Sequence, residues 1–162
     1  MSTSKRVKTA PAIYLCGPIT GQSFKEAAEG WRKDVAFQLE PDITCLNPLR
    51  HLRVDQVSKD DRAEMSPMGA QAGVLSTPRG LTERDRFDTM RSDMIFCNFL
   101  GATKISAGSM IEFGWADIGR VPLLLCMEEE GNPNDHAMVR AIASWIVHDI
   151  DEAIQVTKDL LL

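Results

Sequence analysis

The sequence lacks any long apolar run. None of its 162 residues belongs to an uninterrupted apolar stretch of the roughly eighteen residues that a membrane-spanning helix needs. The first apolar stretch is short and is soon broken by Gly17 and Pro18, which is not typical of a signal peptide. We therefore expect no membrane association and a cytoplasmic location.

Positive charge is also scarce. The chain has 18 Lys and Arg residues against 23 Asp and Glu residues, a formal net charge of −5, and its basic residues are spread along the sequence. Binding to long nucleic acid requires a concentrated basic surface, so we do not expect long nucleic acid as a partner. A small anionic ligand stays open, because backbone amides at helix N-termini bind phosphate without net positive charge.

Motifs for metals, cofactors and serine nucleophiles are missing. There is no C-x-x-C pair, and the three histidines lack ligand spacing relative to the cysteines, so we expect no metal site. The sequence has neither a G-x-x-x-x-G-K-[ST] motif nor a G-x-G-x-x-G motif, which argues against P-loop NTPases and dinucleotide oxidoreductases. It also has no G-x-S-x-G motif, the nucleophile elbow of serine hydrolases. We expect no cofactor. The four cysteines each lie in or at the end of an apolar strand-like run and are predicted to be buried free thiols: Cys16, Cys45, Cys97 and Cys126.

The apolar runs that are present alternate with helical patterns. Strands are predicted at residues 12–16, 43–46, 93–100, 121–127 and 145–147, and helices at residues 23–40, 81–92, 107–119, 136–143 and from 149 or 151 to 162. Thr82 followed by Asp85 resembles an N-cap arrangement for the second helix. The alternation predicts an α/β fold with helices on both faces of a parallel sheet. We expect a single flavodoxin-like (Rossmann-like) doubly wound domain with a five-stranded parallel sheet in the order 2-1-3-4-5.

The length is typical of one domain. Residues 1–10 are predicted to be a flexible N-terminal tail, and residues 11–162 the domain. Residues 49–80 are rich in charge, glycine, proline and methionine and are predicted to form a long loop. This loop is interpreted as a flap over the site or as an oligomer contact.

Two glycine-containing turns follow the first and third predicted strands. In open parallel sheets, ligands bind at the carboxyl ends of the strands where the strand order reverses, which is between strands 1 and 3 here. We expect both turns to frame one pocket, and the second turn leads into a helix that carries Ser106, Gly108 and Glu112. The first turn contributes Gly17, Pro18, Ile19, Thr20 and Gly21.

Glu112 is the strongest candidate for chemistry. It lies in an otherwise apolar helical stretch, where a carboxylate costs free energy unless it faces a polar cavity or finds hydrogen-bond donors. The competing interpretation is a solvent-facing glutamate. Gly108 and Gly114 flank it closely, and glycine is unfavourable in a helix unless something approaches the backbone. We therefore favour a functional role.

Other polar residues are more ambiguous. Asp85 and Asp88 lie one helical turn apart among arginines, which is compatible with an ion-paired surface, and Asp93 is interpreted as a strand-entry cap. Composition alone does not choose among these three. Tyr14 is the only tyrosine and by default a core residue, although a hydrogen bond to Glu112 across the predicted strands is geometrically reasonable.

Four segments resemble one enzyme family. Residues 14–21 resemble the opening motif of the nucleoside 2-deoxyribosyltransferase superfamily, which includes the 2′-deoxynucleoside 5′-monophosphate N-hydrolases. Residues 82–96 resemble its second motif, in which an aspartate, here Asp85, lies eight residues before the strand-opening aspartate. Residues 106–116 resemble its third motif, [D/S]-x-G-x-x-x-E-x-G-x-A, and residues 136–140 a segment that reaches into the neighbouring subunit's site. The resemblance covers most of the chain except residues 49–80.

The resemblance implies roles for these residues. Glu112 would attack the anomeric carbon and form a glycosyl-enzyme intermediate, Tyr14 would orient that carboxylate, and Asp85 would act as acid and base at the leaving nucleobase. The substrate would be a small nucleoside or nucleotide. The protein would be a homodimer or a higher homo-oligomer with shared sites.

The position six residues before the nucleophile separates two subgroups. The deoxyribosyltransferases commonly have aspartate there, which would contact a free 5′-hydroxyl, whereas this chain has Ser106, as in the monophosphate N-hydrolases. A serine hydroxyl and the amides of a helix N-terminus can donate hydrogen bonds to a 5′-phosphate, whereas a carboxylate would repel it. The N-hydrolase motif has arginine where this chain has Thr20, and His136 of a neighbouring subunit is a candidate for the missing positive charge. Met138 of the same segment is a further candidate for substrate binding. A solvated His136 after a turn is the competing interpretation.

Three functional hypotheses follow. The first is an enzyme that cleaves the N-glycosidic bond of a 2′-deoxynucleoside or its 5′-monophosphate and passes the sugar to another base or to water. The second is a non-catalytic nucleotide-binding module on the same fold. The third is a flavodoxin-like domain used in protein assembly.

Overall fold

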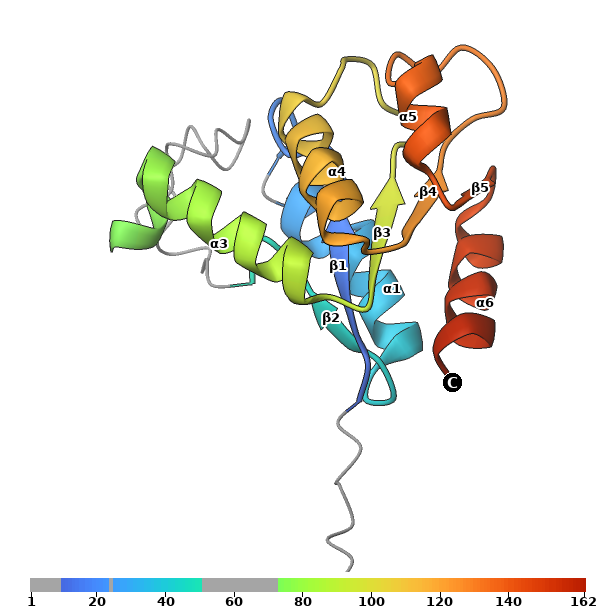
Figure 1. Ribbon diagram of the computed structural model, residues 1–162, viewed down its shortest axis with the longest axis horizontal. Coiled ribbons are helices and arrows are strands. Elements are labelled where there is room, and N and C mark those ends of the chain that lie inside the picture. Colours follow the sequence, from blue (N-terminus) through green and yellow to red (C-terminus); the bar gives the residue numbers. More distant parts are fainter. Residues whose placement is uncertain (1–9, 24, 51–72) are drawn as a thin grey trace, which may run out of the picture.

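The computed structural model describes residues 10–23, 25–50 and 73–162. Five strands of this part of the chain form one parallel sheet in the order β2-β1-β3-β4-β5, which confirms the predicted α/β class and strand order (Figure 1). The strands are β1 (Ala12–Cys16), β2 (Thr44–Leu46), β3 (Met94–Asn98), β4 (Leu123–Cys126) and β5 (Trp145–Val147). The order reverses between β1 and β3, so their carboxyl ends form the switch point at which such sheets bind ligands.

Helices cover both faces of the sheet. On one face lie α1 (Trp31–Leu39) and α6 (Ile150–Leu161). On the other face lie α3 (Pro78–Arg91), α4 (Ala107–Gly119) and α5 (Ala137–Ile142) (Figure 1). Two separate buried clusters result, one beneath each helical layer.

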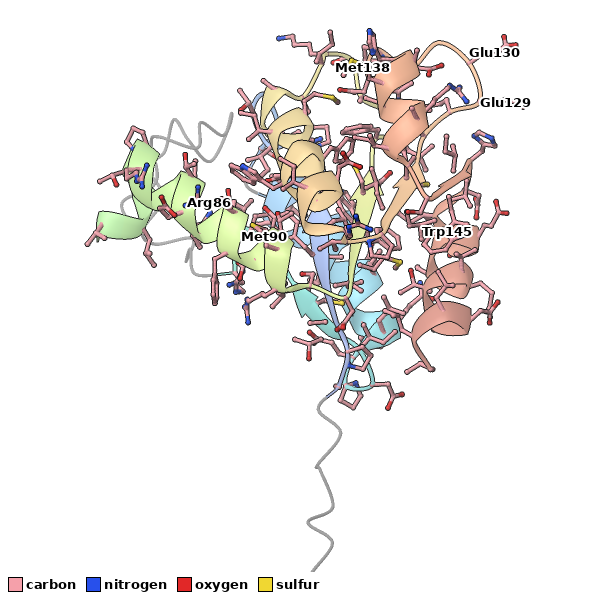
Figure 2. The ribbon with its side chains drawn as sticks, in the orientation of Figure 1. Arg86, Met90, Glu129, Glu130, Met138 and Trp145 are labelled. Atoms are coloured by element: carbon pink, nitrogen blue, oxygen red, sulfur yellow. The ribbon has the colours of Figure 1, made fainter. Side chains whose placement is uncertain are left out.

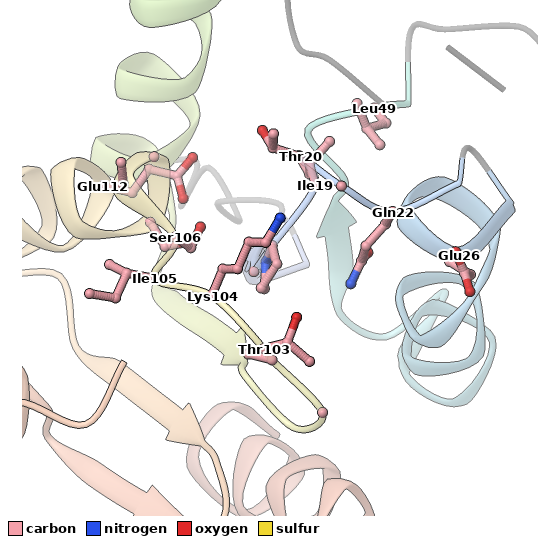
Figure 3. Close-up of a pocket in the computed structure, with 18 of the residues that line it drawn as sticks. Ile19, Thr20, Gln22, Glu26, Leu49, Thr103, Lys104, Ile105, Ser106 and Glu112 are labelled. Carbon is pink, nitrogen blue, oxygen red and sulfur yellow. The ribbon is translucent and has the colours of Figure 1, made fainter. Parts of the chain in front are cut away.

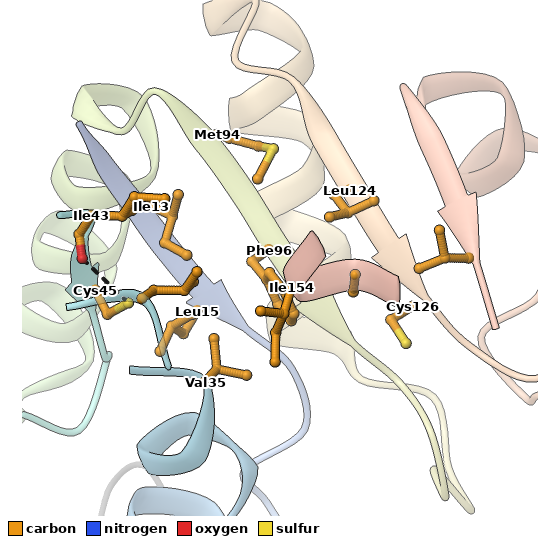
Figure 4. Close-up of a cluster of buried hydrophobic side chains, with 13 residues drawn as sticks. Ile13, Leu15, Val35, Ile43, Cys45, Met94, Phe96, Leu124, Cys126 and Ile154 are labelled. Carbon is orange, nitrogen blue, oxygen red and sulfur yellow. Dashed lines mark hydrogen bonds between the residues drawn. The ribbon is translucent and has the colours of Figure 1, made fainter. Parts of the chain in front are cut away.

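The alternation of side chains along β1 assigns its residues to these two clusters. Ile13 and Leu15 pack against Val35 of α1 and Ile154 of α6 (Figure 4). Successive strand residues point to opposite faces, so the intervening Tyr14 and Cys16 project toward α4. The one strand therefore fills the apolar core with half of its side chains and delivers a hydroxyl and a thiol to the other face.

The prediction of a single helix at residues 23–40 is wrong. The chain forms a short π-helix, η1 (Lys25–Glu29), and then α1, with a break at Gly30. A Cβ atom at Gly30 would lie only 2.6 Å from the backbone oxygen of Glu26, so the break requires glycine. The buried Arg32 donates to the carbonyl of Ala27 at 2.6 Å, which gives that carbonyl a partner outside the α-helical pattern. The glycine at the break and this side-chain hydrogen bond therefore divide a segment whose periodicity is helical throughout.

The next helix begins earlier than predicted. A 3₁₀ turn, η3 (Gly73–Ser76), precedes α3, which starts at Pro78 rather than at residue 81. Thr77 is its N-cap and accepts a hydrogen bond from the Gly80 amide at 3.0 Å, with the proline in the first turn where its missing N–H costs nothing. The predicted cap, Thr82, lies inside the helix and donates to the Pro78 carbonyl at 2.8 Å.

Several other predictions can be compared directly. The helix at residues 107–119 and the strand at residues 145–147 have the predicted bounds, whereas β2, β3 and β4 are shorter than predicted by one to three residues. Asp149 caps α6 by accepting hydrogen bonds from two backbone amides. All four cysteines are described, and they are buried free thiols as predicted. No described helix is long and apolar enough to cross a membrane.

Residues 1–9 and 51–72 lie outside the described residues. The predicted N-terminal tail therefore stays a prediction, as does most of the predicted flap at residues 49–80. Within that range, Leu49 is buried and packs near Ala27. The last residues of the range belong to η3 and to the start of α3.

Candidate active site

A cavity of about 700 Å³ opens at the carboxyl ends of β1 and β3. Residues 17–22, which follow β1, form one wall, and residues 101–109, which follow β3 and begin α4, form another. Leu81, Arg84 and Asp85 of α3 close a third side. Figure 3 shows the two loops facing each other across this space, with Glu112 among the side chains that line it. The two predicted turns therefore do frame one pocket.

The first turn is held from behind by a buried arginine. The Arg32 guanidinium donates to the carbonyls of Leu15 at 3.1 Å and Gly17 at 2.9 Å. A Cβ atom at Gly17 would lie 2.7 Å from the backbone oxygen of Asn98, so only glycine lets β1 turn this close to the end of β3. Sequence reasoning missed Arg32, because an arginine at a helical position is normally solvent-exposed.

Glu112 is held by two donors from β1. The Tyr14 hydroxyl donates to Glu112 Oε1 at 2.7 Å, and the Cys16 thiol donates to Glu112 Oε2 at 2.9 Å. The predicted hydrogen bond from Tyr14 is therefore present, and the solvent-face interpretation of Glu112 is wrong. The contact with Cys16 was not predicted, since the sequence indicated only a buried thiol.

The environment of Glu112 sets its charge. Burial raises the pKa of Glu112 to about 7, although the hydrogen bonds from Cys16 and Tyr14 lower it. The nearby Asp85 also raises this pKa, and Arg32 lowers it. Burial and the adjacent Glu112 raise the pKa of Tyr14 well above its usual value, so its hydroxyl stays protonated and donates. Near neutral pH, Glu112 is thus poised between its acid and its carboxylate form.

The structure separates the three candidate aspartates. Asp85 lines the cavity, where its Oδ1 accepts from Arg84 at 2.8 Å, and burial raises the pKa of its carboxyl group against the effect of Arg84. Asp88 is buried away from the cavity lining and pairs with Arg50 at 2.7 Å and with Arg91. The third, Asp93, accepts from the Ala12 amide at 2.8 Å and ties the start of β3 to β1, as its interpretation as a strand-entry cap predicts.

The second turn presents the N-terminus of α4 to the cavity. Ser106 occupies the N-cap position, but its hydroxyl bonds to the Ser109 hydroxyl at 2.9 Å rather than to a helix amide. The Ser106 amide donates to Asn134 Oδ1 at 2.8 Å, which fixes the turn. Gly108 lines the cavity and has open space where a Cβ would be. Gly114 is exposed, and no described residue beyond its own helical backbone and chain neighbours lies within 4 Å of where its Cβ would be, so the described residues show no close approach to its backbone.

Lys104 was missed by sequence reasoning. It lies in the loop after β3, lines the cavity, and in Figure 3 points toward the loop that carries Ile19 and Thr20. The only sequence signal was a single basic residue two positions before Ser106. It places a positive charge near the position where the N-hydrolase motif has arginine and this chain has Thr20.

Two predicted binding residues lie elsewhere in this chain. His136 is the N-cap of α5, where its Nδ1 accepts from the Met138 amide at 3.2 Å, and Met138 is exposed. Neither lines the cavity of its own chain. Their predicted place in a neighbouring subunit's site stays a prediction. Among the described residues, no group of three or more His, Cys, Asp or Glu side chains is arranged to hold a metal ion.

Solved structures of known proteins share this architecture. The Clostridium botulinum CMP N-glycosidase BcmB aligns over 93% of this chain and 99% of its own length, with a TM-score of 0.55 and 18% identity. The chain shares its fold with an N-glycosidase. A conserved protein from Enterococcus faecalis aligns over 94% of this chain and 99% of its own, with a TM-score of 0.67 and 15% identity.

The same fold also serves a different purpose. A molybdenum cofactor binding protein from Rippkaea orientalis aligns over 98% of this chain and 100% of its own, with a TM-score of 0.55 and 14% identity. No protein-family model and no curated protein matches the sequence. At these identities the likeness shows the fold alone, so function has to be argued from the site.

Proposed function

We propose that this protein cleaves the N-glycosidic bond of a 2′-deoxynucleoside or its 5′-monophosphate through a glycosyl-enzyme intermediate on Glu112. The observation that carries the proposal is the placement of Glu112, whose carboxylate lines a cavity of nucleotide size while Tyr14 and Cys16 hold its two oxygens. Two hydrogen bonds on a partly buried glutamate orient it for attack. A merely structural glutamate has no need of a cavity.

The chemistry proceeds in two steps. A Glu112 oxygen attacks C1′ of the sugar, the bond from C1′ to the base nitrogen breaks, and Asp85 gives its proton to the departing base. Water or a second base then attacks C1′, Asp85 takes up a proton from it, and Glu112 leaves as a carboxylate. The raised pKa of Asp85 supports its role as the acid, because the proton has to be present before the base departs.

The second wall of the cavity supports a 5′-monophosphate as substrate. Ser106, the amides at the start of α4 and the Lys104 ammonium group face the same space. Helix N-terminal amides lack intrahelical partners and bind phosphate oxygens, and a lysine adds a charge-assisted hydrogen bond. We infer that Lys104 supplies the positive charge that Thr20 lacks. The similarity in fold to an enzyme that acts on CMP is in line with a monophosphate and makes ribonucleotides a necessary comparison.

The proposed working unit is a homodimer or a larger homo-oligomer with shared sites. Large apolar side chains are exposed on the outer surfaces of α3, α4 and α5, including Phe87, Met90, Ile111, Ile118 and Met138. Figure 2 labels Met90 on α3 and Met138 on α5. Exposed apolar side chains on neighbouring helices are typical of a protein contact surface. His136 and Met138 would reach a neighbour's cavity across such a contact.

A non-catalytic nucleotide-binding module is the second candidate. It is supported by the similar fold of a molybdenum cofactor binding protein. It differs from the first candidate in one observable respect, since a binding module releases no base.

Product analysis decides between the two. The protein is incubated with a panel of deoxynucleosides, ribonucleosides and their 5′-monophosphates, with and without a second free base, and the products are resolved by chromatography. We expect base release from a monophosphate that is lost in Glu112→Gln. Ligand-induced thermal stabilisation without base release from any member of the panel would favour the binding module instead.

A further inference from the structure

Two donors on one strand bind the two oxygens of one carboxylate. Tyr14 and Cys16 are two residues apart on β1, so their side chains leave the same face of the sheet. Tyr14 Oη lies 2.7 Å from Glu112 Oε1, and Cys16 Sγ lies 2.9 Å from Oε2. A single donor would leave the carboxylate free to turn about its last bond, whereas two donors fix its plane.

The thiol is the donor in its contact with Glu112. Cys16 has no exposed surface, and burial, together with its hydrogen bond to Cys97 and the nearby Glu112, raises the pKa of Cys16 well above its usual value. The group therefore keeps its proton at neutral pH. A protonated thiol next to a carboxylate can only donate to it.

We propose that Cys16 is a positioning residue that forms, with Tyr14, a two-point clamp on Glu112 and favours its carboxylate form. The clamp acts within a set of competing charges. Asp85 on α3 disfavours the carboxylate, while Arg32 on α1 favours it. The catalytic consequence of the clamp rests on the proposed function, but its effect on the ionisation of Glu112 does not.

The type of donor also matters. A thiol donates more weakly than a hydroxyl, so it holds Oε2 while withdrawing less charge from it. Cys16→Ala removes the donor and should disfavour the carboxylate. Cys16→Ser keeps a donor and strengthens it, so it should favour the carboxylate while making it a poorer nucleophile.

The single tyrosine allows a test that needs no substrate. Tyr14 is the only tyrosine in the chain, so tyrosine labelled with ¹³C at the hydroxyl-bearing ring carbon gives one NMR resonance. This resonance follows the ionisation of Glu112 through the hydrogen bond between them. The wild-type transition is expected near pH 7 and should vanish in Glu112→Gln.

The variants then test Cys16 itself. Cys16→Ala should raise the midpoint by about one pH unit, which makes the carboxylate form roughly tenfold rarer relative to the acid at pH 6. Cys16→Ser should leave the midpoint at or below the wild-type value. The matched control is Cys126→Ala, which removes a buried thiol from the opposite face of the sheet and should change nothing. An unchanged midpoint in Cys16→Ala would overturn the proposal.

A second measurement covers the case in which Cys16→Ala does not fold. The infrared S–H stretching bands of the wild-type protein are recorded across the titration of Glu112. One thiol band should move as the carboxylate forms and should stay still in Glu112→Gln. If no thiol band moves in the wild-type protein, Cys16 does not donate to Glu112 and the proposal fails.

Activity measurements separate this proposal from the function itself. If base release is found, the acidic limb of the pH profile of kcat/KM should move with the NMR midpoint in both Cys16 variants. A midpoint that moves in a protein releasing no base would leave the clamp in place and contradict the proposed function. Base release that depends on Glu112, with no shift in Cys16→Ala, would contradict the clamp alone.

Discussion

The Tyr14 hydroxyl donates to Glu112 Oε1 at 2.7 Å and joins the interior strand β1 to helix α4. The two residues are 98 positions apart in the sequence. Parallel pairing of β1 with β3 and the short loop from β3 into α4 bring them together. This contact converts an isolated helical glutamate into an oriented group at the edge of a cavity, and the predictions below depend on it.

Glu112→Gln should fold normally and lose nearly all base release. An amide is too weak a nucleophile to form the glycosyl intermediate, and removal of a covalent catalyst costs several orders of magnitude in rate. Single-turnover assays on the best substrate of the panel measure the loss, and circular dichroism checks the fold. A variant that keeps a substantial rate would remove Glu112 from the mechanism.

The same variant should change how stability depends on pH. The pKa of Glu112 is about 7 in the folded protein and roughly 4.3 in an unfolded chain, so the folded state binds the extra proton between these values. The raised pKa of Glu112 therefore contributes to the free energy of unfolding. This contribution is complete below about pH 4.3 and is lost as the pH rises through 7. Relative to Glu112→Gln, the wild-type free energy of unfolding should fall by on the order of 3 kcal/mol over this window.

Denaturant titrations of both proteins at several pH values measure this difference. Subtracting the two curves removes the contributions of the carboxyl groups that do not interact with Glu112. Asp85 raises the pKa of Glu112, so its coupling with Glu112 stays in the difference. Curves that run parallel between pH 4 and 8 would show that Glu112 is ionised normally in the folded state.

Asp85→Asn should retain substrate binding and slow the departure of the base. The asparagine cannot give up a proton, so substrates with poor leaving groups should lose the most rate and those with highly activated leaving groups the least. Rates on a series of base analogues measure this dependence. Asp117→Asn, on the exposed side of α4, is a control for loss of one carboxylate. Equal losses across the series would exclude Asp85 as the acid.

Substitutions at Ser106 and Lys104 should change the preference for a phosphate. Ser106→Asp places a carboxylate beside the proposed phosphate site and should favour nucleosides over monophosphates, whereas Ser106→Asn has similar size without the charge and should not. Lys104→Gln should weaken the use of monophosphates by about tenfold to a hundredfold, because a hydrogen bond to a charged group contributes roughly 1.5–3 kcal/mol. Free nucleosides should be little affected.

The ratio of kcat/KM for a monophosphate to that for its nucleoside is the measurement in both cases. Lys33→Gln, an exposed lysine on α1 outside the cavity, is the control for Lys104. A ratio that is the same in wild type, Ser106→Asp and Lys104→Gln would mean that the second wall of the cavity does not bind phosphate.

The active protein should sediment as a dimer or a larger oligomer. Substitution of an exposed apolar residue by a charged one, as in Met90→Glu, should weaken the assembly and lower activity together, since each site would need its neighbour's residues 136–140. Phe37→Glu replaces an exposed apolar side chain on α1, away from α3, α4 and α5, and is the control. Full activity from a monomer at working concentration would contradict the shared site.

The sequence alone determined the class of fold and indicated Glu112 as the leading candidate for chemistry. The bounds of α4 and the strand order follow from local patterns, because apolar periodicity and glycine turns act over a few residues and right-handed crossovers leave few topologies. Glu112 stood out as a carboxylate in an apolar helical stretch, whereas only the family resemblance of residues 82–96 distinguished Asp85 from Asp88 and Asp93.

Only the tertiary structure decided which side chains meet. Two features differ from the local propensity: the helix breaks at Gly30, and Arg32 is buried behind the first turn. Two others join segments that are distant in sequence: Cys16 donates to Glu112, and Lys104 lines the cavity opposite the first turn. A thiol, a lysine or an arginine looks the same in sequence whether it is buried in the site or exposed at the surface. The three-dimensional packing determines its partners, and with them its charge and its role.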